Sequence, residues 1–169
     1  LKNIDIQMNE LLRAIKLSKM NTVITYPNYD PKHKKIINFI EKNFKNKNKF
    51  LLVKNLGKNY FSSILKYSTL VLGNSSSGIV EAATFKVPAV NVGIRQEGKV
   101  KPINVIDTNY NYNKIYKAIL IAKSEKFRKK ISRMTNPYEN QISLKKLVSL
   151  ITKLKVNKKL LIKKFIDIK

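Results

Sequence analysis

Apolar residues alternate between helix-like and strand-like spacing along most of this 169-residue chain. Between Leu1 and Lys19 they recur every three or four residues, which predicts an amphipathic helix. Short apolar runs follow, each ended by turn-forming residues and succeeded by another helical pattern. The predicted strands cover residues 22–26, 50–53, 69–72, 87–92 and 104–106. The predicted helices cover residues 31–44, 59–67, 77–85, 113–123, 125–132 and 142–154.

This alternation of strands and helices predicts right-handed crossover connections and a mostly parallel sheet with helices on both faces. We therefore expect an α/β domain over residues 1–154 and a basic tail over 155–169, which packs against something outside the chain. In such folds the ligand lies outside the carboxyl ends of the strands. The loops after Tyr26, Val53, Leu72 and Val92 are therefore the places to look for binding residues.

The charge balance is strongly basic, with 35 Lys and Arg against 10 Asp and Glu and a formal net charge of +25. A nucleic-acid partner would account for this, but the lysines occur in every segment and arginine only at positions 13, 95, 128 and 133. No apolar run approaches the roughly 18 residues needed to span a bilayer, and cysteine is absent. We expect a cytoplasmic protein that binds neither nucleic acid nor membrane.

Carboxylates are scarce, and His33 is the single histidine. General acid/base chemistry usually needs two titratable groups that converge on one pocket. This chain has few candidates for such groups, a scarcity that needs an explanation, and we expect no metal site and no cofactor.

The clearest local signal is the run Gly73-Asn74-Ser75-Ser76-Ser77-Gly78, between a predicted strand and a predicted helix. Free backbone N–H groups at a helix start attract anions, and the three hydroxyls add further donors. The run lacks the Lys-Ser/Thr ending of a Walker loop and is not a G-x-G-x-x-G fingerprint. A phosphate site is one interpretation, and a serine N-cap in a glycine turn is the other.

Two charged residues lie near this run. Glu81, on the first turns of the predicted helix, is placed either to accept hydrogen bonds from sugar hydroxyls or to complement the helix dipole. Arg95 lies in a glycine-flanked loop after the next strand. It is suited to a bidentate phosphate contact, although a solvated loop arginine is the alternative.

These segments resemble the hydrolysing UDP-N-acetylglucosamine 2-epimerases. The resemblance covers residues 21–123 and rests on four motifs: 26–30, 73–82, 87–99 and 104–106. It implies the C-terminal, Rossmann-like half of a two-domain fold of the glycosyltransferase-B type. In that family Ser75 and Ser76 match phosphate ligands, Glu81 the ribose acceptor and Arg95 an arginine near the diphosphate. Asn28 matches a nucleotide-sugar contact, and Leu56 (by its backbone) and Phe61 fall where uracil is held.

The resemblance also implies the reaction. UDP would be eliminated from a UDP-amino sugar and the product hydrated to N-acetylmannosamine or a related sugar, for sialic-acid-like biosynthesis. The acid/base groups would lie upstream of Leu1, and the full-length protein would be a homo-oligomer. Lys99 and Ile94 depart from the usual Arg and Thr of the family. The donor domain of a UDP-sugar glycosyltransferase and a binding module without chemistry remain alternatives.

Overall fold

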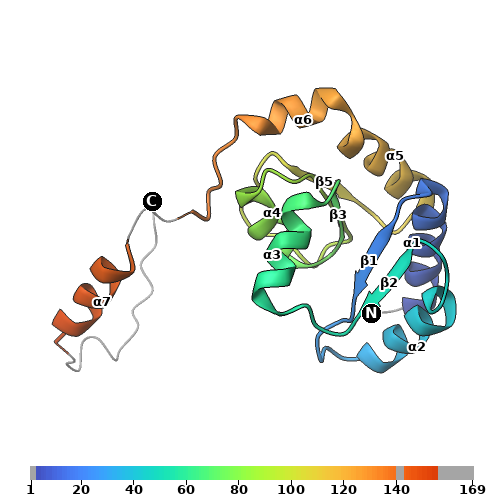
Figure 1. Ribbon diagram of the computed structural model, residues 1–169, viewed down its shortest axis with the longest axis horizontal. Helices are drawn as coiled ribbons and strands as arrows, with labels where there is room; N and C mark the ends of the chain where they lie inside the picture. The colour runs from blue at the N-terminus through green and yellow to red at the C-terminus, as the bar shows by residue number, and fades with distance from the viewer. Residues whose placement is uncertain (1–2, 140–142, 156–169) are drawn as a thin grey trace. The chain divides into compact units, whose positions relative to one another are not determined.

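A computed structural model describes residues 3–139 and 143–155, in which helices and strands alternate (Figure 1). The chain divides into two compact units, Leu1–Tyr138 and Glu139–Lys169. The strands of the first unit are β1 (Thr22–Thr25), β2 (Phe50–Val53), β3 (Val71–Gly73), β4 (Ala89–Val92) and β5 (Val105–Thr108). Its helices are α1 (Ile4–Ser18), α2 (His33–Phe44), α3 (Gly57–Tyr67), the 3₁₀ turn η1 (Ser76–Gly78), α4 (Glu81–Thr84), α5 (Tyr112–Lys123) and α6 (Glu125–Ser132). The second unit contains α7 (Leu144–Lys153).

All strand pairs are parallel, which confirms the α/β class predicted from the alternating pattern. Among the described residues the strands form two sheets rather than one. Strand β1 pairs with β2, while β3, β4 and β5 form a separate sheet in that order. Val71 lies opposite Ala89, and Ala89 lies opposite Val105. Because the strands are parallel, the loops after β3 and β4 leave the same edge of the sheet.

The main core lies between β4, α1 and α5. All four residues of β4 are buried, as expected for a central parallel strand covered on both faces. Val90 and Val92 pack with Ala14 of α1 and with Ile115 and Ile119 of α5. Full burial of each such valine or isoleucine contributes about 1.5–3 kcal/mol.

Two of the smaller hydrophobic clusters pack beneath the helices next to the candidate loops. Leu12, Ile40 and Phe44 cover the β1–β2 ladder from α1 and α2. Leu65 of α3 packs against Ala82 of α4 and Val87, so the short helix after the serine-rich turn is held by the helix before it.

The single helix predicted over residues 77–85 is wrong. The segment instead forms η1, a break at Val80, and the four-residue α4. Gly78 is buried, and a Cβ added to it would lie 3.3 Å from the Ala89 Cβ. A residue larger than glycine at position 78 would therefore crowd β4.

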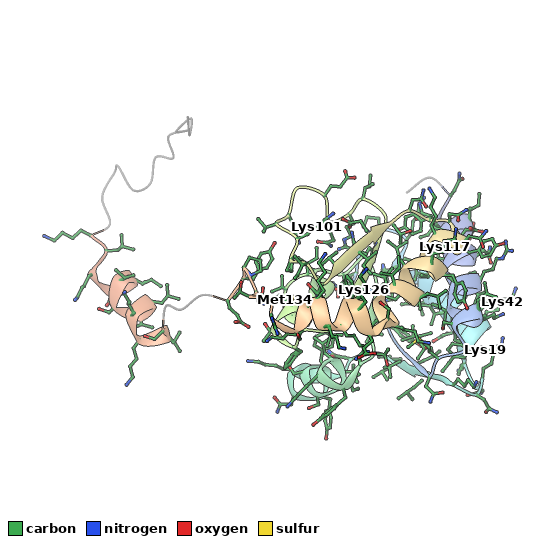
Figure 2. The ribbon with its side chains drawn as sticks, turned by 90° about the horizontal axis from the view of Figure 1, so that it is seen from above. Lys19, Lys42, Lys101, Lys117, Lys126 and Met134 are labelled. Carbon is green, nitrogen blue, oxygen red and sulfur yellow. The ribbon has the colours of Figure 1, made fainter. Side chains whose placement is uncertain are left out.

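Lysines lie on many elements, as expected from the sequence. Figure 2 labels Lys19 after α1, Lys42 on α2, Lys101 before β5, Lys117 on α5 and Lys126 on α6.

In the second unit, α7 buries none of its residues. Its apolar side chains are exposed, among them Leu144, Leu147 and Ile151. No helix of the described residues is long and apolar enough to cross a membrane. Ile142 and the predicted tail from residue 156 onward lie outside the described residues, and the proposed domain over 1–154 stays a prediction.

Candidate functional site

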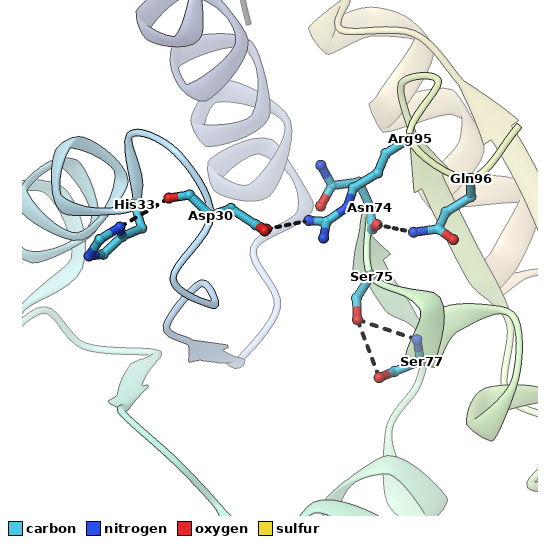
Figure 3. A network of polar contacts seen from close by, with 7 residues as sticks. All are labelled: Asp30, His33, Asn74, Ser75, Ser77, Arg95 and Gln96. Atoms are coloured by element: carbon cyan, nitrogen blue, oxygen red, sulfur yellow. Dashed lines mark hydrogen bonds and ion pairs between the residues drawn. The ribbon is translucent and has the colours of Figure 1, made fainter.

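The serine-rich turn follows β3 directly. Gly73 ends the strand with φ 145°, and Ser75 then caps η1. The Ser75 Oγ accepts a hydrogen bond from the Ser77 backbone N–H at 3.3 Å and donates one to the Ser77 Oγ at 3.2 Å (Figure 3). The N-cap interpretation of Ser75 is therefore confirmed.

Several donors of this turn are nevertheless available to a ligand. Ser75 and Ser76 are exposed. Within the described part of the chain, neither their backbone N–H groups nor the Ser76 hydroxyl donates a hydrogen bond. Because η1 and α4 have only three and four residues, the helix dipole is much smaller than a continuous helix would supply. An anion would be held here mainly by discrete N–H and O–H donors.

Glu81 is the first residue of α4, and its side chain is exposed. Among the described residues, its carboxylate forms no ion pair or hydrogen bond. Its oxygens are therefore free to accept hydrogen bonds from a ligand.

Arg95 lies on the loop that leaves β4 through Gly93, which has φ 84°. Its Nη1 is 2.9 Å from Oδ2 of Asp30, on the loop after β1 (Figure 3). The two side chains are 51% and 46% exposed, so this ion pair is a weak contact open to solvent. It uses one of five guanidinium donors and leaves the others for an anionic ligand.

Asp30 was missed as a site residue by the sequence analysis, although it belongs to the motif at 26–30. Asn28, in the same loop, is exposed, and its backbone oxygen accepts a hydrogen bond from the Asp30 N–H at 2.7 Å. The Asp30–Arg95 contact thus brings the loops after β1 and β4 together.

Leu56 and Phe61 lie at the start of α3. Leu56 is the half-buried N-cap residue. The Phe61 side chain packs against Leu65, Ala82 and Val87. The half-buried Phe61 therefore supports α4 from the side of the cluster, and a contact of Leu56 and Phe61 with uracil stays a prediction.

A second residue that the sequence analysis missed is Gln96. Its side chain is 3% exposed, and Nε2 donates a hydrogen bond to the backbone oxygen of Asn74 at 2.7 Å (Figure 3). This bond joins the Arg95 loop to the serine-rich turn. The signal in the sequence was the polar residue next to Arg95, but its burial is a property of the folded chain.

Two groups near the strand ends have shifted pKa values. Burial raises the pKa of the Asp107 carboxyl, but hydrogen bonds from Asn91 and Lys101 and the charge of Lys101 together outweigh burial, so the pKa lies below its usual value. The bonds measure 2.7 Å from Asn91 and 2.9 Å from Lys101. The hydrogen bond from Tyr26 to Glu41 raises the pKa of the Tyr26 phenol, with smaller contributions from burial and from the Glu41 charge. These shifts come from structural contacts.

The candidate site is an open edge in this chain. Two surface grooves, of about 380 and 410 Å³, lie elsewhere, between β5 and α5 and at the start of β1 and β2. Neither is lined by Ser75, Glu81 or Arg95. Among the described residues, no group of His, Cys, Asp and Glu could hold a metal ion. The edge therefore offers donors for an anion and one free carboxylate, but little enclosure.

Comparison with known proteins points to one family. The family of UDP-N-acetylglucosamine 2-epimerase matches residues 2–152. The chain is 33% identical over 153 residues to the polysialic acid biosynthesis protein P7 of Escherichia coli, covering 89% of this chain and 39% of that protein. It is 36% identical over 113 residues to the GDP/UDP-N,N'-diacetylbacillosamine 2-epimerase (hydrolyzing) of Campylobacter jejuni, covering 65% and 29% respectively. The chain thus spans no more than about two fifths of these relatives.

Solved structures show the same fold. The Methanocaldococcus jannaschii UDP-GlcNAc 2-epimerase in complex with UDP-GlcNAc and UDP superposes with a TM-score of 0.69 at 20% identity, over 89% of this chain and 41% of that one. The S. aureus MnaA–UDP co-structure gives 0.68 at 20% identity, over 89% and 42%. The fold class expected from the sequence is therefore confirmed.

Proposed function

The chain belongs to the UDP-N-acetylglucosamine 2-epimerase family, and from this premise we propose that its exposed sheet edge binds the UDP portion of a UDP-amino sugar. One observation carries the proposal. The Gln96–Asn74 hydrogen bond of 2.7 Å fastens the Arg95 loop to the serine-rich turn. Two sets of donors suited to a diphosphate therefore belong to one edge.

Each side chain has a proposed role. Ser75 and Ser76 donate to the phosphates through backbone N–H groups and hydroxyls, and Arg95 donates through its free guanidinium N–H groups. Glu81 accepts hydrogen bonds from the ribose hydroxyls, since an ionised carboxylate is an acceptor only. Asn28 contacts the nucleotide sugar, and the Leu56 backbone with Phe61 holds the uracil.

We propose that the full-length protein is a hydrolysing 2-epimerase. Elimination would remove UDP from C1 and the proton from C2 of the sugar, leaving a double bond. Water would then add a hydroxyl at C1 and a proton at C2 on the other face, which releases the free 2-epimer. The C. jejuni and Legionella pneumophila relatives carry the word hydrolyzing in their names, and the E. coli relative is named for polysialic acid biosynthesis, which supports this reaction and its use.

In this proposal the acid/base groups belong to the part of the relatives that this chain does not cover, and no cofactor is needed. We also propose a cytoplasmic location and a homo-oligomeric full-length protein, to be tested by cell fractionation and by light scattering. The donor domain of a UDP-sugar glycosyltransferase is the alternative function. The match to the epimerase family over residues 2–152 favours the epimerase.

Calorimetry with the 169-residue chain tests the proposal. UDP should bind, and uridine should bind more weakly because it lacks the diphosphate. A UDP-release assay with UDP-N-acetylglucosamine should detect no turnover by the same preparation. Failure to bind UDP would refute the binding role, and robust turnover would refute the placement of the acid/base groups outside this chain.

A further inference from the structure

The backbone between Gly73 and Glu81 is held by side-chain amides from distant segments. Three carbonyl oxygens of this stretch accept a hydrogen bond from an Asn or Gln side chain. The pairs are Gln96 Nε2 to Asn74 O at 2.7 Å, Asn104 Nδ2 to Gly78 O at 3.4 Å, and Asn136 Nδ2 to Val80 O at 2.9 Å. The donors lie 22, 26 and 56 residues further along the chain.

These amides are buried, with Gln96 at 3%, Asn104 at 0% and Asn136 at 8% exposure. Buried amides lower stability unless their polar atoms are paired. In the described part of the chain, the side-chain oxygens of Gln96 and Asn104 have no hydrogen-bond partner. An apolar residue in place of Gln96 would remove the unpaired oxygen but would also leave the Asn74 carbonyl without its donor, so the two effects on stability oppose each other.

Gln96 differs from the other two because it follows Arg95 directly. The two side chains diverge, with Gln96 reaching Asn74 while Arg95 reaches Asp30 (Figure 3). Glycines with positive φ flank them at positions 93 and 98. The Gln96 amide joins the loop that carries Arg95 to the serine-rich turn.

We propose that Gln96 is a positioning residue that holds the Arg95 guanidinium at the correct distance from the donors of Ser75 and Ser76. This inference rests on the proposed binding of UDP. A diphosphate contacts both sets of donors only if their separation is fixed beforehand, and such preorganisation lowers the entropy lost on binding. Uridine has no phosphate, so its binding does not depend on the distance between Arg95 and the donors of Ser75 and Ser76.

The test compares Gln96→Leu with a matched control, Asn43→Leu. Leucine keeps most of the volume of Gln96 and removes both the anchor and the unpaired oxygen. The half-buried Asn43 donates a similar bond to the Phe39 oxygen at 2.9 Å, within α2 and outside the site. Gln96→Leu should weaken UDP binding about 3- to 10-fold, the equivalent of one net hydrogen bond, and leave uridine binding and the urea midpoint nearly unchanged. Asn43→Leu should leave both affinities unchanged.

A double-mutant cycle gives the second readout. In an Arg95→Ala background, Gln96→Leu should have no further effect on UDP binding, because the group it positions is gone. If Gln96→Leu does not fold, Gln96→Asn serves instead, since its amide is one methylene too short to reach Asn74.

The outcomes separate the two proposals. If the wild-type chain does not bind UDP, the proposed function fails whatever Gln96 does. If the wild type binds UDP and the Gln96 variant binds it equally well, positioning by Gln96 is refuted. Equal losses for UDP and uridine together with a lower urea midpoint would show a general structural role and overturn the inference.

Discussion

Arg95 and Ser76 present donors at the same edge of the sheet, but different neighbours hold them. Arg95 is paired with Asp30 and half exposed, whereas the Ser76 hydroxyl is unpaired among the described residues. Replacing either residue with alanine should weaken UDP binding about ten- to a hundred-fold, because a hydrogen bond to a charged group contributes about 1.5–3 kcal/mol. Uridine binding should hardly change. Calorimetry with both ligands checks this.

Arg128→Ala is the matched control for this prediction. Arg128 is exposed and donates to the Thr69 oxygen at 2.9 Å, away from the proposed site. Its loss should change neither affinity. Equal losses for UDP and uridine in the Ser76 or Arg95 variants would contradict the assignment of these residues to the diphosphate.

Glu81 should act as a ribose acceptor and not as a proton donor. Glu81→Gln keeps the shape but replaces one acceptor oxygen with a donor, so a sugar hydroxyl is left poorly matched. In a full-length enzyme that contains this chain, the change should mainly raise KM and weaken UDP, with kcat much less affected. Glu125→Gln, on the exposed face of α6, is the control. Near-complete loss of kcat with UDP affinity intact would show that Glu81 takes part in the chemical step.

Some residues of the candidate site could be predicted from the sequence and others could not. Ser75, Ser76 and Arg95 were predicted because a glycine-rich turn and a loop arginine indicate anion binding by themselves. Asp30 and Gln96 were missed because their importance depends on partners 65 and 22 residues away. Nothing in the local pattern identifies which distant group a polar side chain will meet.

At the scale of elements, most bounds followed from periodicity and turn residues. The strand at 50–53 and the helix at 125–132 have the predicted ends. The region 77–85 differed, because it forms η1 and α4 instead of one helix, and helical periodicity does not indicate this break. The division of the described strands into two sheets was not predictable either, since periodicity does not specify strand pairing.

The contacts of Asp107 between strands β4 and β5 should make the stability of the protein depend on pH. Asp107 on β5 has a lowered pKa, so its contribution to stability is present above the ordinary carboxyl value of 3.8 and is lost as pH falls through the lower, folded-state pKa. Asp107→Asn should remove this part of the acid dependence. Urea unfolding of both proteins between about pH 5 and about pH 3 checks this. Identical pH profiles would contradict the role of the Asn91 and Lys101 contacts.

The loop after β4 depends on Gly93. Its φ is +84°, and an added Cβ would lie 2.5 Å from Cε2 of the half-buried Tyr110. Gly93→Ala should therefore lower the free energy of unfolding by about 1–2 kcal/mol for the left-handed backbone. Overpacking should lower it by about 1–3 kcal/mol more. Gly98→Ala is the control, because it has φ +79° with no atom within 4 Å. Urea denaturation measures the stability of both variants. Equal losses of stability would show that Tyr110 moves aside freely.

At the scale of the whole molecule, we propose that the net charge of +25 serves a small anionic ligand rather than a nucleic acid. Figure 2 labels lysines on α2, α5 and α6, after α1 and before β5. A basic surface also raises the local concentration of a small anion such as UDP. This interpretation agrees with the epimerase family match over residues 2–152.

The two units should be separable in solution. All four hydrophobic clusters of the described residues lie within Leu1–Tyr138, and α7 buries none of its residues. A chain that ends after Tyr138 should therefore keep its thermal midpoint and its affinity for UDP. A chain that ends after Arg133 is the control, because it also loses buried Met134 and Asn136, whose amide holds Val80. Loss of a buried methionine alone costs about 2–5 kcal/mol.

Thermal unfolding and calorimetry of the three chains decide the matter. We expect the chain that ends after Arg133 to unfold at a clearly lower temperature and to bind UDP more weakly. It lacks Asn136, one of the amides that hold the serine-rich turn. Equal stability of the two truncated chains would contradict the role of Met134 and Asn136. Destabilisation by the cut after Tyr138 would instead support one domain that extends to residue 154, as the sequence pattern predicts, with α7 contributing to its core.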